Sequence, residues 1–171
     1  MRLLFEIDTK DYKKDGRAFV RPSVRAVIVR GGKVAMVHSL KYDYYKFPGG
    51  GIEDGESMTD ALIRETAEEA GLAVDISSVR ELGYVHRVQR SDRDDADLFI
   101  QDNYYYVCDA SEERIPQNLD GYEAEEGFTL EFVEAAHAIA TNREKDHGPK
   151  DKNMLEREAR VLEILSEEGF I

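Results

Sequence analysis

The sequence predicts an α+β fold, because segments typical of strands and of helices are mixed without the strand–helix–strand rhythm of a parallel sheet. Two strongly patterned helices are expected at residues 58–70 and 154–168, between several apolar segments of strand length. The chain has no internal repeat and no Pro- or Ser-rich linker. We therefore expect a mixed sheet between helices, in a single domain over residues 1–171.

Composition and charge narrow the classes of partner. The net charge is −13 and the pI is about 4.8. Nucleic-acid affinity comes largely from Lys and Arg that replace counterions on phosphates, so we expect no nucleic-acid partner. An acidic protein still binds small phosphorylated ligands when a bound metal cation reverses the local charge.

Location is predicted from the absence of targeting patterns. No apolar run approaches the roughly 18 residues of a membrane span, and the N-terminus MRLLFEIDTK lacks a secretory pattern. We expect no membrane partner and a cytoplasmic location. Cys108 is the single cysteine, which excludes an internal disulfide and argues against a cysteine-based zinc site.

The first elements lead to a glycine-rich loop. Strands are expected over residues 23–29 and 34–38, with Gly31 and Gly32 forming a two-residue hairpin turn between them. A short loop then carries three tyrosines (Tyr42, Tyr44 and Tyr45). Glycines at positions 49–51 free the backbone from ordinary φ restrictions, which suits a loop that approaches phosphate or metal, or simply a tight turn.

A helix over residues 58–70 is predicted by its ends. Ser57 is a good N-cap with Asp60 three residues later, and Gly71 is a good terminator. At about 100° per residue, one side collects residues that pack on a core (Leu62, Ile63, Thr66, Ala67 and Ala70). Another side collects Glu65, Glu68 and Glu69. Like charges at this spacing destabilise an isolated helix by about 0.2–0.5 kcal/mol per pair, so either solvent or an external cation neutralises them.

The remaining elements complete the sheet and its cover. Strands are expected over residues 80–90, 98–108 and 130–133, followed by a short helix through residue 140. The last helix spans about residues 154–168, capped by Asn153 and ended by Gly169. Its buried stripe is expected to contain Leu155, Ala159, Leu162 and Leu165. The N-terminal segment, residues 1–20, is expected to form an extra strand or the interface arm of a possible homodimer.

The three glutamates belong to a longer pattern. It reads Gly50, five residues, Glu56, seven residues, Arg64 and Glu65, two residues, Glu68 and Glu69, one residue, Gly71 and Leu72. At ordinary frequencies, a chance match occurs about once in 10⁷ starting positions. The segment resembles the Nudix box, and the chain resembles a Nudix (MutT-like) hydrolase. The resemblance is specific over residues 47–72. Thr66 departs from it, because the family usually has an aliphatic residue there; we expect only a small effect on stability.

The resemblance implies an α/β/α sandwich with a mixed central sheet and the box loop and helix at its edge. It also implies a metal site made by Glu65, Glu68, Glu69 and the backbone carbonyl of Gly50. Hard oxygen ligands suit Mg²⁺, with Mn²⁺ as the alternative. Arg64 is implied to orient carboxylates such as Glu56, a task suited to a rigid guanidinium fork.

The implied reaction is hydrolysis of the diphosphate linkage in a nucleoside diphosphate joined to another group. Metal ions polarise the phosphates and activate the water, and a general base completes the activation. The base is a box glutamate or a carboxylate of a later loop. Glu126 has a suitable spacing, with Glu123 and Glu125 as competitors. The segment DGYEAEEG, residues 120–127, is equally typical of a solvent-facing loop.

The sequence leaves the substrate open among nucleoside triphosphates, ADP-ribose, nucleotide sugars and dinucleoside polyphosphates. Tyr44 is a candidate for stacking on a nucleobase, and Lys46 and Arg25 for phosphate contacts. Weaker candidates for phosphate contacts lie nearby or in the turn after residue 86 (Lys41, His38, Arg87, Arg90 and Arg93). The other histidines are expected to be structural or solvated (His86, His137 and His147).

Two other functions were compared with hydrolysis. A non-catalytic nucleotide-sensing Nudix domain usually carries a degraded box or an attached DNA-binding domain, and this chain has an intact box. An isopentenyl diphosphate isomerase type of enzyme needs a reactive cysteine with a partner glutamate, and Cys108 has no obvious companion. Hydrolysis is therefore the favoured prediction.

Overall fold

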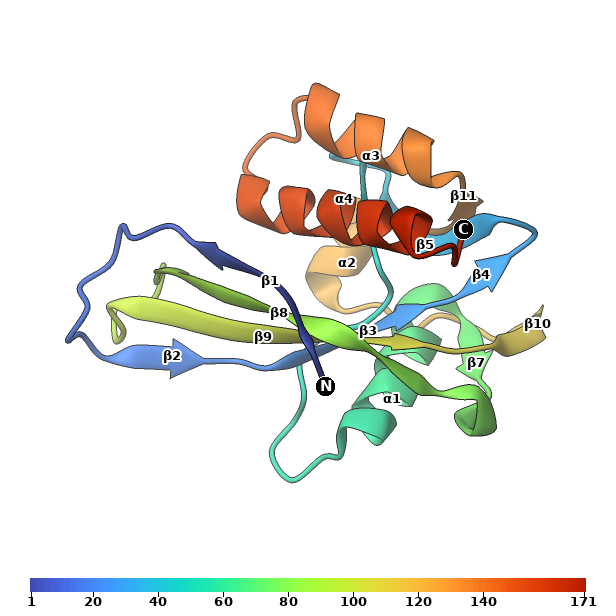
Figure 1. The fold of residues 1–171 in the computed structure, drawn as a ribbon, viewed down its shortest axis with the longest axis horizontal. Coiled ribbons are helices and arrows are strands. Elements are labelled where there is room, and N and C mark those ends of the chain that lie inside the picture. Colours follow the sequence, from blue (N-terminus) through green and yellow to red (C-terminus); the bar gives the residue numbers. More distant parts are fainter.

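The computed structural model describes residues 1–171 and places helices on both faces of a layer of strands (Figure 1). Helix α1 (Met58–Ala70) lies on one face, and α3 (Ala135–Glu144) and α4 (Lys152–Glu167) lie on the other. A short helix, α2 (Gly121–Glu126), was not expected, because residues 120–127 were predicted as a loop. The arrangement confirms the predicted α+β class and α/β/α sandwich. None of the helices has the length and apolarity needed to cross a membrane.

The larger sheet is mixed, as predicted. Its strands are β1 (Leu3–Asp8), β2 (Ala18–Val20), β3 (Ser23–Val27), β8 (Arg80–Arg90) and β9 (Leu98–Val107). The order is β1-β8-β9-β2, and β3 also pairs with β9. The pairing of β8 with β9 is antiparallel, whereas β1, β2 and β3 run parallel to their neighbours. The N-terminal segment thus forms strands of this sheet, which is one of its two expected roles.

A second sheet is antiparallel. It contains β4 (Val29–Arg30), β5 (Lys33–Ser39), β6 (Tyr44–Lys46) and β11 (Phe128–Val133). Gly31 and Gly32 join β4 to β5 with φ of 55° and 76°, which confirms the predicted hairpin turn. Strands β7 (Leu72–Val74) and β10 (Ala110–Arg114) pair separately, and a single 3₁₀ turn covers residues 76–78.

Two local predictions are wrong. The segment with Tyr44 and Tyr45 is not a loop, because both residues lie in β6 and pair with β5. The cap of α4 is Asp151 and not Asn153: the Asp151 side chain accepts a hydrogen bond from the Asn153 backbone. Helix α4 thus begins at Lys152, two residues before its predicted start, a shift that is common for element ends, whereas β6 is a strand that was not predicted.

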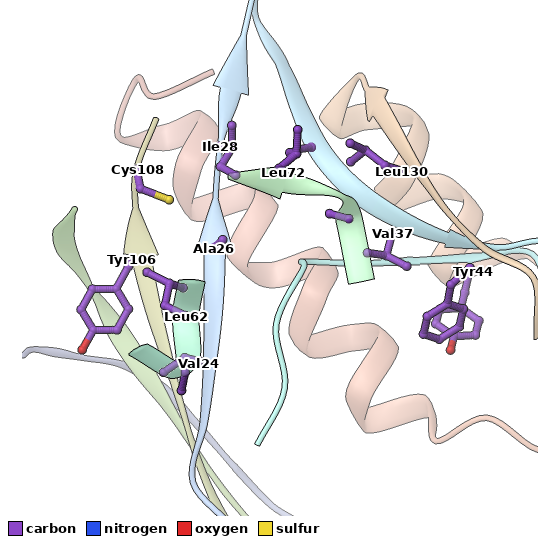
Figure 2. Packing of buried hydrophobic residues seen from close by; sticks show 14 of the residues in the cluster. Val24, Ala26, Ile28, Val37, Tyr44, Leu62, Leu72, Tyr106, Cys108 and Leu130 are labelled. Atoms are coloured by element: carbon purple, nitrogen blue, oxygen red, sulfur yellow. The ribbon is translucent and has the colours of Figure 1, made fainter. Parts of the chain in front are cut away.

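Two apolar clusters hold the layers together. One lies between α1 and the strands and includes Val24, Ala26, Leu62 and Leu72 (Figure 2). The other lies under α3 and α4 and includes Leu162 and Leu165 of the predicted stripe. Because successive strand residues point to opposite faces, β3 sends Val24 and Ala26 toward α1 and sends the residue between them, Arg25, toward α4.

Candidate active site

The glycine loop runs beside strand β3 as an irregular extension of the sheet. The backbone amide of Ala26 donates to the Pro48 carbonyl at 2.8 Å, and the amide of Val24 donates to the Gly50 carbonyl at 3.0 Å. Gly51 forms an isolated β-bridge with Ser23. The Gly50 carbonyl, predicted as a metal ligand, therefore already accepts one hydrogen bond. Since a carbonyl oxygen has two lone pairs, a second interaction remains available to it.

Close packing explains two of the loop glycines. A Cβ atom on Gly50 would lie 2.2 Å from Oε2 of Glu65, so the Glu65 carboxylate rests directly on the Gly50 backbone. Gly49 has a φ of 136°, and a Cβ atom on it would lie 2.1 Å from the carbonyl oxygen of Val24. Both positions thus require glycine for contact with a neighbouring element. The loop lies between β3 and α1 without room for side chains.

Helix α1 has the predicted ends. The Ser57 hydroxyl accepts from the Asp60 amide at 3.1 Å, and Gly71 adopts a left-handed conformation with φ of 63°. The last carbonyls of the helix are satisfied by a later segment of the chain: the amide of Asn118 donates to the Glu68 carbonyl, and the amide of Ile115 donates to the Gly71 carbonyl, at 3.0 Å each. This segment continues directly to residue 120 beside α1.

Arg64 connects the carboxylates of the box. Its Nε and Nη2 donate to the two oxygens of Glu56, at 2.8 Å each. Its Nη1 donates to Glu65 at 2.8 Å and to Glu68 at 3.2 Å, and its Nη2 also donates to the Gly51 carbonyl at 3.2 Å. All five N–H donors of the guanidinium are engaged. The structure thus supports the orienting role expected of Arg64.

The Arg64 guanidinium holds the pKa of Glu56 at about 2, well below its ordinary value. The backbone amide of Glu53 donates to the same carboxylate at 3.0 Å and acts in the same direction. Glu56 therefore remains ionised over the whole physiological range and continuously compensates the charge of Arg64.

Replacing Glu56 by Gln is expected to destabilise the protein at neutral pH and to do so less as the pH falls. The pKa in the fold, about 2, lies below the value of about 4.3 expected in the unfolded chain. The stabilisation is therefore complete above about pH 4.3 and is lost as the pH falls toward 2. Urea unfolding of both proteins at pH 7 and pH 3 measures the difference. An equal destabilisation at both pH values would contradict the ion pair.

Glu69 does not share an exposed face with Glu65 and Glu68, which corrects the prediction. Its side chain is 2% exposed, because it lies seven positions after Leu62 and so returns to the buried side of the helix. Lys46 Nζ lies 2.5 Å from its Oε1, and the Gly49 amide donates to its Oε2 at 3.0 Å. Burial raises the pKa of Glu69 to about 7, although Lys46 and the amide act in the opposite direction.

The two predicted phosphate-binding cations lie near Glu69. Lys46 is buried and forms the ion pair just described. Arg25 is 8% exposed, and its Nε and Nη1 are buried without a hydrogen-bond partner. The Arg25 charge is close enough to lower the pKa of Glu69. Because a buried charge without hydrogen-bond partners is unfavourable, an anion at this position would stabilise the Arg25 guanidinium.

Tyr44 is not placed for the stacking role predicted for it. It is 2% exposed, and its ring meets the rings of Phe128 and His147 edge to face. Burial and the nearby carboxylate of Glu126 raise its pKa. No open ring face remains for a nucleobase.

The candidate bases of residues 120–127 are also engaged elsewhere. Glu126 is buried and accepts from the hydroxyls of Ser39 at 3.1 Å and Tyr44 at 2.9 Å, and it forms an ion pair with Lys150. Glu123 accepts from the Asp120 amide at 2.9 Å and helps to begin α2. Glu125 pairs with Lys41 at the surface. None of the three lines the cleft beside the box.

That cleft has a volume of about 480 Å³ and combines the box with two residues that the sequence analysis missed. Its lining residues are Arg21, Gly51, Ile52, Glu53, Asp54, Arg64, Glu65, Glu68 and Asp120. Arg21 packs its guanidinium against Gly51 and makes no ion pair, and the exposed Asp120 precedes α2. Neither residue belongs to a local motif. Arg21 lies between β2 and β3, and Asp120 is brought in by the segment that closes the end of α1.

The remaining predicted phosphate contacts lie outside the cleft. His38 is held between Glu131 at 2.8 Å and Asp43 at 3.0 Å. Arg87 pairs with Asp151, and Arg93 pairs with Asp95 at 2.8 Å. Arg90 and Arg93 line a larger, polar hollow of about 680 Å³ at the β8–β9 turn, together with several aspartates. In that turn the arginines compensate local carboxylates.

Two histidines have the structural roles expected of them. His147 is buried, and its ring nitrogens lie 2.9 Å from the Tyr42 carbonyl and 3.1 Å from the Thr141 carbonyl. His86 contacts Asp102 across β8 and β9 at 2.7 Å. The third, His137, meets the Tyr45 ring edge to face. None of the three is near the box.

The donor set fits a hard divalent cation, with two carboxylates in place. Glu65 and Glu68 line the cleft, and each uses one oxygen for Arg64 and has the other without a hydrogen-bond partner. Glu69 uses both oxygens for internal contacts, and nowhere are three His, Cys, Asp or Glu side chains gathered closely enough to form a complete site. Mg²⁺ is commonly bound by one or two carboxylates, waters and substrate phosphates. The residues present therefore suit such an ion.

The site combines an α/β/α sandwich with a glycine loop packed against helix α1, and Arg64 links the loop to the carboxylates of that helix. This combination is typical of a site that binds and cleaves phosphate compounds. The family model for the NUDIX domain matches residues 20–157, and the chain therefore belongs to the Nudix hydrolase family. Hydrolases of this family generally use divalent metal ions.

Curated relatives match over a limited region. An RNA pyrophosphohydrolase of Tolumonas auensis is 42% identical over 62 residues, which is 36% of this chain and 35% of that protein. Another of Hydrogenovibrio crunogenus is 41% identical over 64 residues, 37% of this chain and 38% of that protein. The match thus spans little more than a third of the length of these relatives.

Solved structures show the same fold. A NUDIX hydrolase from Nitrosomonas europaea has a TM-score of 0.58 at 16% identity, covering 84% of this chain and 90% of that one. A MutT NUDIX hydrolase from Burkholderia pseudomallei has a TM-score of 0.52 at 17% identity, covering 81% of this chain and 97% of that one. At these identities the likeness concerns the fold alone.

Proposed function

We propose that this protein hydrolyses the diphosphate linkage of a nucleoside diphosphate joined to another group, with Mg²⁺ or Mn²⁺ as cofactor. The observation that carries the proposal is the cleft in which Arg64 holds Glu65 and Glu68 with one free oxygen each. Two carboxylates fixed by one arginine suit a cation that must also bind substrate phosphates.

In this proposal Glu65 and Glu68 would hold the cation, with Glu69, in place of its contact with Lys46, and the Gly50 carbonyl as further ligands. When bound, the ion would polarise the phosphates and lower the pKa of the attacking water. Arg64 and Glu56 fix the carboxylates, because a saturated guanidinium leaves them little freedom to rotate.

The proton of the attacking water requires a base in the cleft. Glu65 remains one candidate, as a box glutamate that lines the cleft and has one oxygen without a hydrogen-bond partner. Of the later carboxylates, Asp120 is favoured over Glu126, since Asp120 lines the cleft and is exposed, whereas Glu126 is buried against two hydroxyls and Lys150. A base must lie within hydrogen-bond reach of the water it activates.

Basic side chains around the cleft are proposed to hold the substrate phosphates. Arg21 lines the cleft without an ion pair, and Arg25 has two buried nitrogens without partners. Lys46, which pairs with Glu69 in this structure, would be free for phosphate if Glu69 bound the cation. Phosphate oxygens would satisfy the charges of all three residues.

Four substrate classes remain in the proposal: nucleoside triphosphates, ADP-ribose, nucleotide sugars and dinucleoside polyphosphates. The names of the curated relatives, RNA pyrophosphohydrolases, add RNA as a fifth. A net charge of −13 is unfavourable for long contacts with a phosphate backbone, so an RNA substrate would be held chiefly by its terminal phosphates and first nucleotides.

The alternative is a nucleotide-sensing Nudix domain without catalysis. A sensing domain requires the same phosphate contacts but no working metal site. The complete set of Arg64 contacts with the box carboxylates favours hydrolysis over sensing. An isomerase that uses Cys108 is disfavoured, because this thiol is buried in the apolar cluster and burial raises its pKa to about 12.

We further propose that residues 1–171 act as one domain, with a homodimer as an open possibility. Strand β1 and the end of α4 lie outside residues 20–157, yet β1 pairs with β8, and Leu165 packs in the cluster under α4. The additional residues therefore extend the same sheet and core.

The test is a phosphate-release screen over the five substrate classes, each with Mg²⁺, with Mn²⁺ and with EDTA. Coupled phosphatase or pyrophosphatase reveals the products. Turnover of one class that EDTA abolishes is the expected result. Tight nucleotide binding in a thermal-shift assay, with no turnover of any class, would establish the sensing domain in its place.

A further inference from the structure

Strand β6 contains Lys46 and leads directly into the glycine loop. Only one edge of β6 pairs with another strand, and that strand is β5. On the other edge, Asn142 of α3 accepts from the Tyr45 amide at 2.8 Å and donates to the Tyr45 carbonyl at 2.8 Å. Glu158 of α4 accepts from the Phe47 amide at 3.1 Å. Two helix side chains thus occupy the place of a neighbouring strand.

Glu158 belongs to a buried chain of polar groups. It is 0% exposed and pairs with Arg157, which is 1% exposed. Arg157 donates to the Asn103 side chain at 2.7 Å, and the same Asn103 oxygen accepts from the Ser23 hydroxyl at 2.8 Å. All four residues are buried, and together they extend from α4 through β9 to β3.

This chain reaches both ends of the glycine loop. At one end Glu158 binds the Phe47 amide, and at the other Ser23 forms the β-bridge with Gly51. Between these ends, Gly49 donates to Glu69, and Gly50 lies against Glu65. The position of the loop relative to the box carboxylates therefore depends on residues of the last helix.

Stability alone is a poor explanation for this ion pair. Replacing a buried ion pair by apolar residues of similar volume is often neutral or stabilising. The attraction between the charges is lost, but the two charged groups no longer have to be removed from water. Glu158 and Arg157 are fully buried between α4 and the sheet, where an apolar cluster also packs. Their contacts with the loop point to a role in its geometry.

We propose that Glu158 is a positioning residue that holds the glycine loop against the carboxylates of α1, with Arg157 and Asn142 as its supporting partners. The inference rests on the proposed hydrolysis and extends the active site to α4. Glu158 touches neither substrate nor cation. It acts through the Phe47 amide and hence through the backbone of Gly49 and Gly50.

The decisive comparison is between two double variants, R157M/E158Q and R157M/E158M. Both remove the two charges, but only the first retains an oxygen that accepts from the Phe47 amide. We expect R157M/E158M to have a kcat about 10- to 100-fold lower than R157M/E158Q, with a smaller change in KM and a melting temperature lower by a few degrees, because the buried Phe47 amide loses its acceptor. Glu163→Gln, on the outer side of α4 beside Arg143, is the control and should equal wild type.

Two further measurements do not depend on turnover. Mn²⁺ affinity of the protein alone, by electron paramagnetic resonance, should be weaker in R157M/E158M than in R157M/E158Q. In wild type, hydrogen exchange of the Tyr45 and Phe47 amides should be as slow as that in β5, a result that requires no variant to fold.

Equal kcat and equal Mn²⁺ affinity in the two double variants would overturn the positioning role, and so would fast exchange of the Phe47 amide in wild type. If wild type hydrolyses none of the five substrate classes, the proposed hydrolysis fails. The Mn²⁺ and exchange measurements then still decide whether Glu158 positions the loop.

Discussion

Replacing Glu68 by Gln is expected to lower kcat by about 10³-fold while the fold persists. The carboxylate is one of two with a free oxygen in the cleft, and a bound cation contributes several kcal/mol of charge stabilisation to the transition state. An amide oxygen is a much weaker ligand than a carboxylate. The side chain is 34% exposed and touches only Arg64, so the free energy of unfolding should change by about 0.5 kcal/mol or less.

Steady-state rates at saturating Mg²⁺, together with thermal unfolding of the same samples, test this expectation. Glu144→Gln is a matched control, because Glu144 lies at the exposed end of α3 and makes no ion pair. Unchanged kcat in the Glu68 variant would remove the metal site from the mechanism. A large loss of stability would show that the variant reports on the fold and not on the site.

Replacing Gly49 by Ala is expected to destabilise the protein by about 3 kcal/mol or more and to abolish activity. A φ of 136° is unfavourable for any residue with a side chain, by about 1–3 kcal/mol. The new methyl group would also lie 2.1 Å from the Val24 carbonyl oxygen, which is part of the backbone and cannot rotate away. Relieving that overlap adds about 1–3 kcal/mol and moves the amide that binds Glu69.

Urea unfolding measures the loss, with Gly121→Ala as control. Gly121 is the first residue of α2, has no positive φ and has no atom within 4 Å of a new Cβ, so its variant should be at least as stable as wild type. A Gly49 variant with wild-type stability would mean that the loop can leave β3 without affecting the fold.

The sequence predicts the parts of the site whose determinants are local. Helix α1 has its predicted bounds because the Ser57 cap and the Gly71 terminator both act within a few residues of the ends. The pairing of Arg64 with Glu56 follows from the box pattern and is present at 2.8 Å. The stripe of leucines on α4 likewise follows from helical spacing, since a helix buries one face in any context.

Polar residues with distant partners could not be predicted in the same way. Glu69 was expected on an exposed face, but Lys46 and the Gly49 amide, 23 and 20 positions away, allow its burial. Arg157 and Glu158 lie outside the predicted buried stripe of α4, yet both are buried, and they bind Asn103 and the Phe47 amide. A local pattern contains no information about such partners, and charged residues are buried mainly when a partner exists.

Thr66 illustrates the same limit in a single side chain. Its methyl packs inward as predicted, and the residue is fully buried, but its hydroxyl has no hydrogen-bond partner. A buried hydroxyl without a partner is unfavourable by about 1–3 kcal/mol. The aliphatic residue usual in the family would therefore fit this position at least as well.

The attachment of the glycine loop to α4 also bears on how the protein folds. The hydrogen bond between Phe47 and Glu158 joins residues 111 positions apart, and that between Ser23 and Asn103 joins residues 80 apart. Contacts of such long range require the closure of a long loop, and the entropy lost on closure makes them slow to form. Helix α1 is stabilised by residues adjacent in the sequence and can form early. The glycine loop reaches its final position only when α4 has packed against the sheet. Recovery of activity during refolding should therefore coincide with the final ordering of the chain.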